Sequence, residues 1–387
     1  AHEAYNHEAS SLVRPALAIP AHGHGEKEWH VTAETIQLLT PEGERVDHPD
    51  YPLGDVDIKG MYRDMVLVRR IDTEAIALQR QGELGLWASL LGQEAAQIGS
   101  ARALSAKDMA FPSYREHGVA WCRGLDMLRL IEMFRGVNKG AWDPEEHKFH
   151  LYTIVIGDQT LHATGYAMGI QRDASEDEAV IVYFGDGATS QGDVSEAFSW
   201  ASVFHAPVVF FCQNNQFAIS ASPERQSRIP IYQRASGFGF PGIQVDGNDV
   251  LACYAVTRQA MRAAREGEGP TLIEAFTYRM GAHTTTDDPT RYRMASEVET
   301  WRLRDPIERV RSYLARTGEA DGAFFERVAE EADELAAKLR AACLALPDPP
   351  PLALFDHVYA DGNAIIDAER AQYAAYLAGF EEEAAER

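Results

Sequence analysis

Short apolar runs alternate with amphipathic stretches along the middle of the chain, a pattern typical of a parallel sheet flanked by helices. Residues 179–184 (AVIVYF) and 207–212 (PVVFFC) are continuously apolar, as expected of strands that are buried on both faces. Residues 193–205 between them have helical spacing, with Asp193 and Glu196 placed to form a capping box. A strand, a helix and a second strand within about 30 residues predict a right-handed βαβ unit with parallel strands.

The alternation continues beyond this unit. The segments GIQVDG (242–247) and TLIEAFTYR (271–279) predict two further strands, joined by a helix over residues 251–265. We therefore predict an α/β fold with a doubly wound parallel sheet. Residues 108–118 have an apolar start followed by a charged loop, and residues 137–147 are expected to form an irregular loop. Helical spacing of apolar residues predicts further helices over residues 57–81, 92–104, 125–134 and 324–346.

Three segments with different patterns suggest how the chain is organised. Residues 1–50 lack sustained periodicity, and we expect an N-terminal arm there with one short strand at 29–32. Residues 51–320 contain the alternating pattern and are predicted to form the α/β domain. Residues 321–387 are helical and acidic, and they predict a C-terminal helical extension that packs on the same domain or on a partner.

The charge of the chain limits what it can bind. Its formal net charge of −23 disfavours nucleic acid and anionic membranes as partners, because both are bound mainly through Lys and Arg. No apolar run reaches the roughly 18 to 20 residues that cross a bilayer. A phosphate-bearing ligand would therefore require a few local cations, a helix N-terminus or a metal ion.

The cysteines indicate the compartment. They lie far apart without a C-x-x-C pair, which argues against a zinc site or a disulfide framework and fits a reducing environment. Residues 1–29 lack the apolar core of a signal peptide, so we expect a cytoplasmic protein. The four cysteines are Cys122, Cys212, Cys253 and Cys343.

Two oxygen-bearing side chains follow the two central predicted strands. Asp186 follows the first strand and Asn215 follows the second, where ligands of open parallel sheets bind. Carboxylate and amide oxygens suit a hard divalent cation such as magnesium. Gly185 and Gly187 allow the backbone to approach a ligand closely, and the amides that follow lie near a helix start, where an anion can bind.

Two nucleotide-binding motifs are rejected on context. Gly237, Gly239 and Gly242 spell G-x-G-x-x-G, but no clear buried strand precedes them and Pro241 stands where the helix should begin. The sequence contains no G-x-x-x-x-G-K-[ST], so a P-loop is excluded.

Several segments together resemble one enzyme family. GDGATSQGD, followed by PVVFFCQNN, is similar to the diphosphate motif of thiamin-diphosphate enzymes. The segments GQEAAQIGSARAL, PSYREHG, IVIGDQTLHATG and TYRMGAHTTTDDPTRYR resemble alpha subunits of the decarboxylating component of 2-oxo acid dehydrogenase complexes. The resemblance extends from about residue 57 into the C-terminal region, and it implies the thiamin-diphosphate-binding fold for the predicted sheet.

The resemblance implies a role for each matching residue. Asp186, the Asn215 side chain and the Phe217 carbonyl would bind magnesium, while the backbones of Gly187 and Ala188 would contact the cofactor.

Four more positions carry implied roles. Tyr114 and Arg115 would hold the diphosphate, and arginine suits phosphate because its planar fork donates several hydrogen bonds. Ile156 would press on the bent cofactor and hold its aminopyrimidine through the backbone. His283, the implied catalytic residue, would lie over the diphosphate at the mouth of the substrate channel.

The chain departs from the family pattern at three positions. Gln213 replaces an Arg found in relatives that use branched-chain substrates, so one diphosphate contact is neutral or lost. Ala282 replaces a second histidine, and Thr284 replaces the regulatory serine of animal relatives, which makes kinase control there doubtful. The polar loop over residues 283–293 is expected to be mobile and to become ordered when the cofactor binds.

The implied reaction is the oxidative decarboxylation of a 2-oxo acid, with transfer of the acyl group to a lipoyl group on an acyltransferase component. The sequence offers no carboxylate for the pyrimidine ring of the cofactor, which in this family comes from a beta subunit. We therefore expect two alpha and two beta subunits. Branched-chain substrates of the 3-methyl-2-oxobutanoate type are favoured over pyruvate, and the alternatives are an acetoin dehydrogenase subunit or a non-catalytic scaffold.

Overall fold

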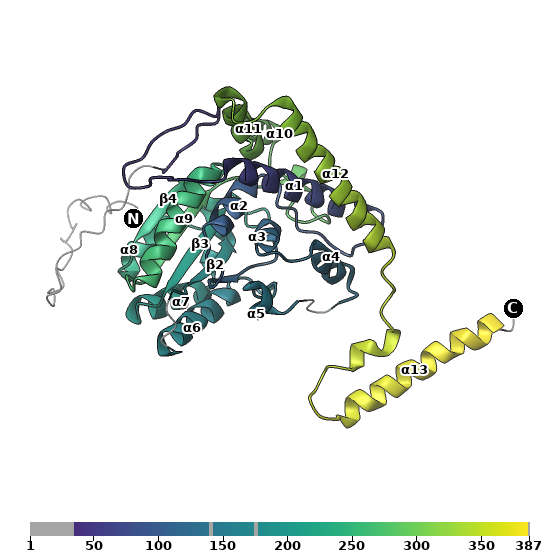
Figure 1. The fold of residues 1–387 in the computed structure, drawn as a ribbon. Coiled ribbons are helices and arrows are strands. Elements are labelled where there is room, and N and C mark those ends of the chain that lie inside the picture. Colours follow the sequence, from purple (N-terminus) through teal and green to yellow (C-terminus); the bar gives the residue numbers. More distant parts are fainter. Residues whose placement is uncertain (1–34, 139–141, 174–176, 386–387) are drawn as a thin grey trace, which may run out of the picture. The chain divides into compact units, whose positions relative to one another are not determined.

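A parallel five-stranded sheet forms the centre of the protein (Figure 1). The computed structural model describes residues 35–138, 142–173 and 177–385, so the strand predicted at 29–32 and most of the predicted arm lie outside the described residues. The strand order is β1-β2-β3-β5-β4, and every neighbouring pair is parallel, which confirms the predicted α/β fold. The strands are β1 (Met109–Phe111), β2 (Val180–Gly185), β3 (Val208–Asn214), β4 (Gly242–Asp246) and β5 (Thr271–Phe276).

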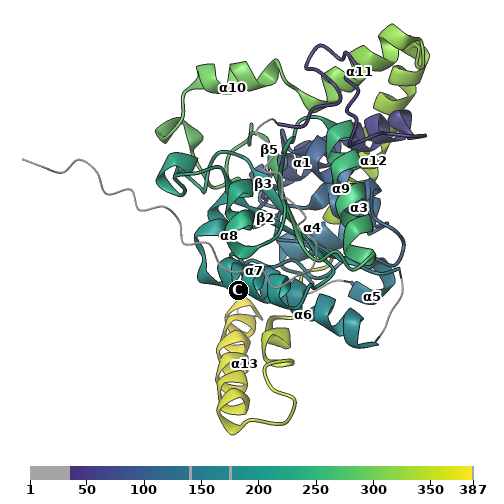
Figure 2. The same ribbon diagram turned by 90° about the vertical axis from the view of Figure 1, so that its left-hand side faces the viewer.

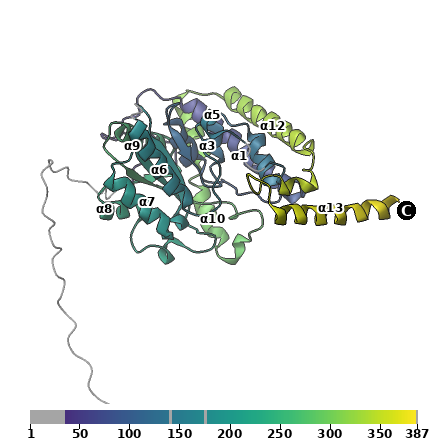
Figure 3. The same cartoon turned by 90° about the horizontal axis from the view of Figure 1, so that it is seen from below.

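Both faces of the sheet are covered by helices, as expected for a doubly wound sheet. Alternate residues of β2 enter different apolar clusters, with Val182 in one and Ile181 in the other. Helices α6 (Asp158–Asp173) and α7 (Gly192–Val203) cover the first face and lie side by side (Figure 3). The opposite face is covered by α9 (Val250–Arg265), seen in Figure 2, and by α2 (Glu94–Arg102), seen in Figure 1.

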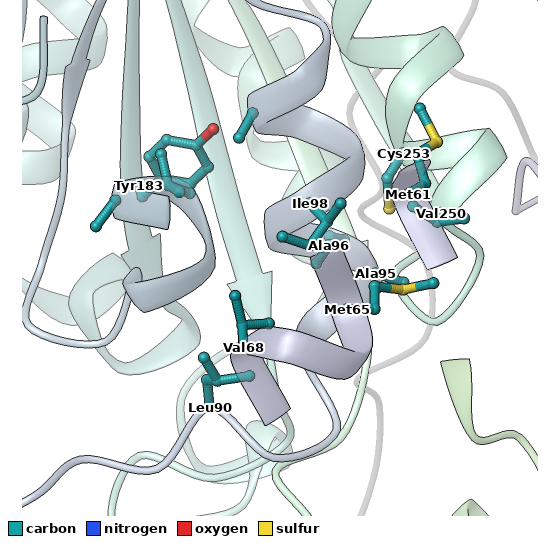
Figure 4. Close-up of a cluster of buried hydrophobic side chains, with 14 of the residues drawn as sticks. Met61, Met65, Val68, Leu90, Ala95, Ala96, Ile98, Tyr183, Val250 and Cys253 are labelled. Atoms are coloured by element: carbon teal, nitrogen blue, oxygen red, sulfur yellow. The ribbon is translucent and has the colours of Figure 1, made fainter. Parts of the chain in front are cut away.

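The apolar cluster that contains Ile181 extends outward from α2 and α9 to the long helix α1 (Ile58–Arg80). Met61, Met65 and Val68 of α1 pack in this cluster (Figure 4). Helix α12 (Gly322–Leu344) packs along α1 and is joined to it by ion pairs, including Arg63 with Glu331. The remaining helices are α3 (His117–Cys122), α4 (Met127–Arg135), α5 (Pro144–His147), α8 (Arg234–Phe238), α10 (Ala295–Arg302), α11 (Pro306–Thr317) and α13 (Ala364–Ala385). No helix of the described residues is long and apolar enough to span a membrane.

Some local predictions were wrong. The capping box does not form, because α7 begins at Gly192 and leaves Asp193 inside the first turn, with Gln191 as an N-cap that makes no side-chain bond. Strand β1 forms in the apolar start of residues 108–118, for which no strand was predicted, and helix α5 occurs where an irregular loop was expected. The rejected glycine motif ends a helix and begins a strand, since Gly239 caps α8 in the left-handed region and Gly242 opens β4.

A buried aspartate joins the first described segment to the sheet domain. One oxygen of Asp249 caps α9 by accepting from the backbone nitrogens of Leu251 (2.9 Å) and Ala252 (3.1 Å). Its other oxygen accepts from the backbone nitrogens of Leu38 and Leu39, both at 2.6 Å. One carboxylate therefore satisfies donors from two distant parts of the chain.

Removal of this carboxylate should destabilise the protein more than removal of an ordinary helix cap. Asp249→Ala leaves buried N–H groups unpaired, so we expect the free energy of unfolding to fall by about 3 kcal/mol or more. Asp126 caps α4 through a single bond to Leu128, and Asp126→Ala should cost about 1 kcal/mol. Urea denaturation followed by circular dichroism measures both, and equal losses would contradict this role of Asp249.

Candidate functional site

A cavity of about 250 Å³ lies at the carboxyl ends of β2 and β3. The strands are adjacent, with Gly185 paired to Gln213, so the residues that follow them meet at one edge of the sheet. All the residues singled out from the sequence line this cavity, although their roles as ligands stay predictions. They are Tyr114, Arg115, Ile156, Asp186, Gly187, Ala188, Gln213, Asn215, Phe217 and His283.

Asp186 begins the 3-10 helix η1 (Asp186–Ser190) directly after β2, and its side chain is buried. No Lys or Arg nitrogen of the described residues lies within ion-pair distance of its carboxylate, whose Oδ2 accepts from Gln226 Nε2 at 2.8 Å. Burial raises the pKa of this carboxyl, while the bond from Gln226 and the charge of Arg279 act in the opposite direction. A buried carboxylate without an ion-pair partner is suited to a cation that comes with a ligand.

Asn215 lies beside Asp186, and its amide is oriented by the protein. Its Nδ2 donates to Gln93 Oε1 at 3.1 Å, which leaves Oδ1 as the oxygen that can face a metal. Oδ1 itself is 3.3 Å from the backbone nitrogen of Phe217. Gln93 is fully buried, and its Nε2 has no hydrogen-bond partner in the part of the chain that the structure describes. An unpaired buried donor in the cavity wall fits an anionic ligand such as a phosphate.

The backbone at Gly187 packs closely against Ala218. A Cβ atom there would lie 2.7 Å from the Cβ of Ala218, so the position requires glycine. The oxygen donors and the buried donor together fit magnesium and a diphosphate.

Two buried arginines converge on His283. Arg115 donates through Nη1 to the Ser89 carbonyl (2.5 Å) and through Nη2 to the His283 carbonyl (2.8 Å). The Nδ1 atom of His283 lies 3.3 Å from Arg115 Nη2 and 3.4 Å from Arg279 Nη1. Arginine can only donate, so Nδ1 is the acceptor and Nε2 carries the proton in this network.

His283 is therefore neutral. Burial, followed by the charges of Arg115 and Arg279, lowers its pKa to about 3. At physiological pH the ring offers an Nε2–H donor and no positive charge. It can donate a hydrogen bond to a developing negative charge in the cavity.

Arg279 is a site residue that the sequence reasoning missed. It is buried, and it donates to the Phe217 carbonyl and, through its other terminal nitrogen, to the Ile219 carbonyl, both at 2.7 Å. The Phe217 carbonyl keeps a second lone pair for the predicted metal contact. Arg279 was placed inside a predicted strand that ran to residue 279. In the structure β5 ends earlier, at Phe276. Arg279 therefore follows a strand at the same edge of the sheet as Asp186.

The turn that Arg279 holds is strained. Gln216 and Ile219 have φ angles of 73° and 54°, in the left-handed region that a β-branched residue such as Ile219 rarely adopts. Such a conformation costs on the order of 1–3 kcal/mol and persists only when surrounding bonds impose it. The two bonds from Arg279 supply that restraint at the turn that carries the Phe217 carbonyl.

Tyr114 and Ile156 lie at different parts of the cavity wall. The ring of Tyr114 meets that of His283 edge-on at a centroid distance of 6.2 Å, and the Arg115 guanidinium lies 5.5 Å from the Tyr114 centroid. Ile156 is 41% exposed, and its neighbours Ile154 and Val155 are more exposed still. An exposed apolar segment therefore adjoins the cavity before α6 begins.

Gln213 is turned towards the protein. Its Nε2 donates to Glu116 Oε1 at 2.6 Å, and its Oε1 accepts from Gln97 Nε2 at 3.1 Å. Both ends of the amide are thus occupied inside the fold. This arrangement favours loss of the diphosphate contact that an arginine makes in relatives.

The loop over residues 283–293 is held by its own bonds. Asp287 accepts from the His283 backbone nitrogen (2.8 Å) and from the Tyr292 hydroxyl (2.5 Å). Arg293 donates to the carbonyls of Arg279, Met280 and Gly281. Ordering of this loop by cofactor stays a prediction.

Comparisons with known proteins identify the family of the chain. Residues 62–343 match the family model described as dehydrogenase E1 component. The 3-methyl-2-oxobutanoate dehydrogenase subunit alpha of Mycobacterium tuberculosis (strain H37Rv) is 46% identical over 353 residues, which cover 90% of this chain and 95% of that protein. The pyruvate dehydrogenase E1 component subunit alpha of Bacillus cereus is 42% identical over 304 residues, covering 78% and 82%. The chain belongs to the dehydrogenase E1 component family.

Proposed function

We propose that this chain is the alpha subunit of a branched-chain 2-oxo acid dehydrogenase that uses thiamin diphosphate and magnesium. It acts with a beta subunit and passes the acyl group to a lipoyl group on an acyltransferase component. The observation that carries the proposal is the pair of oxygen donors, Asp186 and Asn215, at adjacent strand ends beside buried Arg115. This arrangement supplies a metal site and the local positive charge that a diphosphate needs in a chain of net charge −23.

Each residue has a task in this proposal. Asp186, Asn215 and the Phe217 carbonyl hold the metal ion, with Arg279 fixing the carbonyl from behind. Thiamin diphosphate, when bound, supplies the centre that stabilises the carbanion left by loss of carbon dioxide. His283 directs its Nε2–H into the cavity as a neutral donor, because arginine nitrogens occupy Nδ1.

A second chain is needed to complete the site. In the described part of the chain, Asp186 and Glu116 are the carboxylates that line the cavity. Asp186 is assigned to the metal. Glu116 accepts from Ser113 through Oε2 and from Gln213 through Oε1, so both of its oxygens are already engaged inside the fold. This supports a carboxylate from a beta subunit and an assembly of two alpha and two beta subunits.

The choice of substrate rests on the relatives. The branched-chain relative is 46% identical over 95% of its length, against 42% over 82% for the pyruvate relative from Bacillus cereus. We therefore propose acids of the 3-methyl-2-oxobutanoate type and keep pyruvate as the second candidate. The presence of Asp186, Asn215, Arg115 and His283 in one cavity argues against a non-catalytic scaffold.

The purified chain should need its partner for activity. We expect weak binding of thiamin diphosphate and no decarboxylation by the chain alone, and both should appear when the beta subunit is co-purified with it. Release of carbon dioxide from 3-methyl-2-oxobutanoate measures this. Turnover by the chain alone would contradict an active site shared between subunits.

Asp186→Ala should abolish magnesium-dependent cofactor binding. The variant removes the one carboxylate assigned to the metal, and we expect activity to fall by about 100-fold or more. Asp193→Ala, seven residues along at an exposed position of α7, is the matched control and should retain activity. Calorimetric titration with thiamin diphosphate and size-exclusion chromatography with the beta subunit separate cofactor loss from assembly loss. Equal cofactor binding by Asp186→Ala and wild type would refute the assignment.

The substrate can be decided by kcat/KM of the assembled enzyme. An apolar pocket distinguishes acids that differ by a methylene or two by about 1–3 kcal/mol, which is roughly 10-fold to 200-fold. We expect 3-methyl-2-oxobutanoate to be preferred over pyruvate within that range. The reverse preference would keep the enzyme class and change the proposed substrate. Activity on acetoin alone would contradict the proposed reaction and favour an acetoin dehydrogenase.

A further inference from the structure

Gln226 contacts the metal-binding carboxylate from outside the cavity. It does not line the cavity that contains Asp186 and Asn215, and no motif in the sequence points to it. Its Nε2 nevertheless lies 2.8 Å from Asp186 Oδ2, forty residues away in the chain. It lines a second cavity, of about 310 Å³, that Asp186 also borders.

The fold brings this side chain to Asp186 by reversing the loop that follows β3. Ala218 and Ala221 exchange two backbone hydrogen bonds of 2.9 Å, and the 3-10 helix η2 (Pro223–Arg225) then returns the chain. Gln226 ends η2, where its backbone nitrogen donates to the Pro223 carbonyl. The position of Gln226 is therefore set by a short, hydrogen-bonded loop.

The orientation of the Gln226 amide follows from its neighbours. Its Nε2 faces two acceptors, Asp186 Oδ2 at 2.8 Å and the Ala221 carbonyl at 3.3 Å. A flipped amide would set its oxygen against both, so the nitrogen must be the atom that points at Asp186. Its Oε1 is buried without a hydrogen-bond partner among the described residues and lies on the Gly187 side.

The bond from Gln226 engages one of the two oxygens of the Asp186 carboxylate. Oδ2 accepts from Gln226, which fixes the plane of the group, and Oδ1 accepts no side-chain hydrogen bond among the described residues, so it is the less engaged oxygen for a metal ion. Hydrogen bonds of this kind to a metal-ligating carboxylate orient it and raise metal affinity.

We propose that Gln226 is a positioning residue of the magnesium site: its amide holds Asp186 with one oxygen directed to the metal. This inference rests on the proposed function, because it requires that Asp186 binds magnesium with the cofactor. A different role, bracing the loop over residues 216–230 without effect on the metal, predicts a different result for the same variant.

The test replaces the donor and keeps the size of the side chain. Gln226→Met, assembled with the beta subunit, is titrated with thiamin diphosphate in a calorimeter at a series of magnesium concentrations. We expect the magnesium concentration that half-saturates cofactor binding to rise by about 10-fold to 100-fold. Cofactor affinity at saturating magnesium should stay unchanged.

Two further variants keep the test decisive. Gln233→Met is the matched control, because Gln233 is also half-buried but donates to the Tyr232 hydroxyl and not to Asp186. It should bind magnesium and cofactor like the wild type. Gln226→Leu removes the same donor with a different shape, so it answers the question if Gln226→Met fails to fold.

The outcomes separate the inference from the function on which it rests. Wild-type magnesium dependence in the folded Gln226 variants overturns the positioning role and leaves the proposed function intact. A lowered melting temperature with unchanged magnesium dependence also overturns it, in favour of loop bracing. If the wild-type assembly binds thiamin diphosphate without any need for a divalent ion, both the proposed function and this inference fail.

Discussion

The parallel pairing of β2 with β3 is the constraint on which the rest of the site depends. Because Gly185 pairs with Gln213, the two strands end at the same edge of the sheet and deliver Asp186 and Asn215 side by side. Strand β5 joins the same edge from the other side of β3 and contributes Arg279. A slip of this register would separate the oxygen donors from each other and from the arginine that holds the adjoining turn.

The positive charge at this edge of the sheet is carried by buried arginines. Arg115 and Arg279 are almost inaccessible to solvent, and both turn nitrogens towards His283, which is thereby kept neutral. Their positive field is directed into a small cavity in a chain that is otherwise strongly acidic. An anionic cofactor that arrives with its own divalent cation suits such a cavity, because the carboxylate of Asp186 and the arginines each find an opposite charge.

The sequence allowed strands β2 to β5 and the lining of the cavity to be predicted, because buried strands and the residues that end them have strong local signals. Strand β1 was not predicted. Helix α6 was not predicted, because its buried face consists largely of small and polar residues such as Thr160, Ala163 and Thr164. Arg279 was assigned to a strand that ends three residues earlier. Gln226 could not have been found, because its contact with Asp186 depends on how a loop of irregular backbone returns to the sheet.

The strained turn at Ile219 has a consequence for how this edge of the sheet is organised. Because the bonds from Arg279 impose the left-handed backbone, contacts within the chain itself hold the turn in its conformation. The ordering entropy is lost once, during folding, and not in each binding event. A ligand that contacts the Phe217 carbonyl would therefore meet a turn whose shape is already fixed.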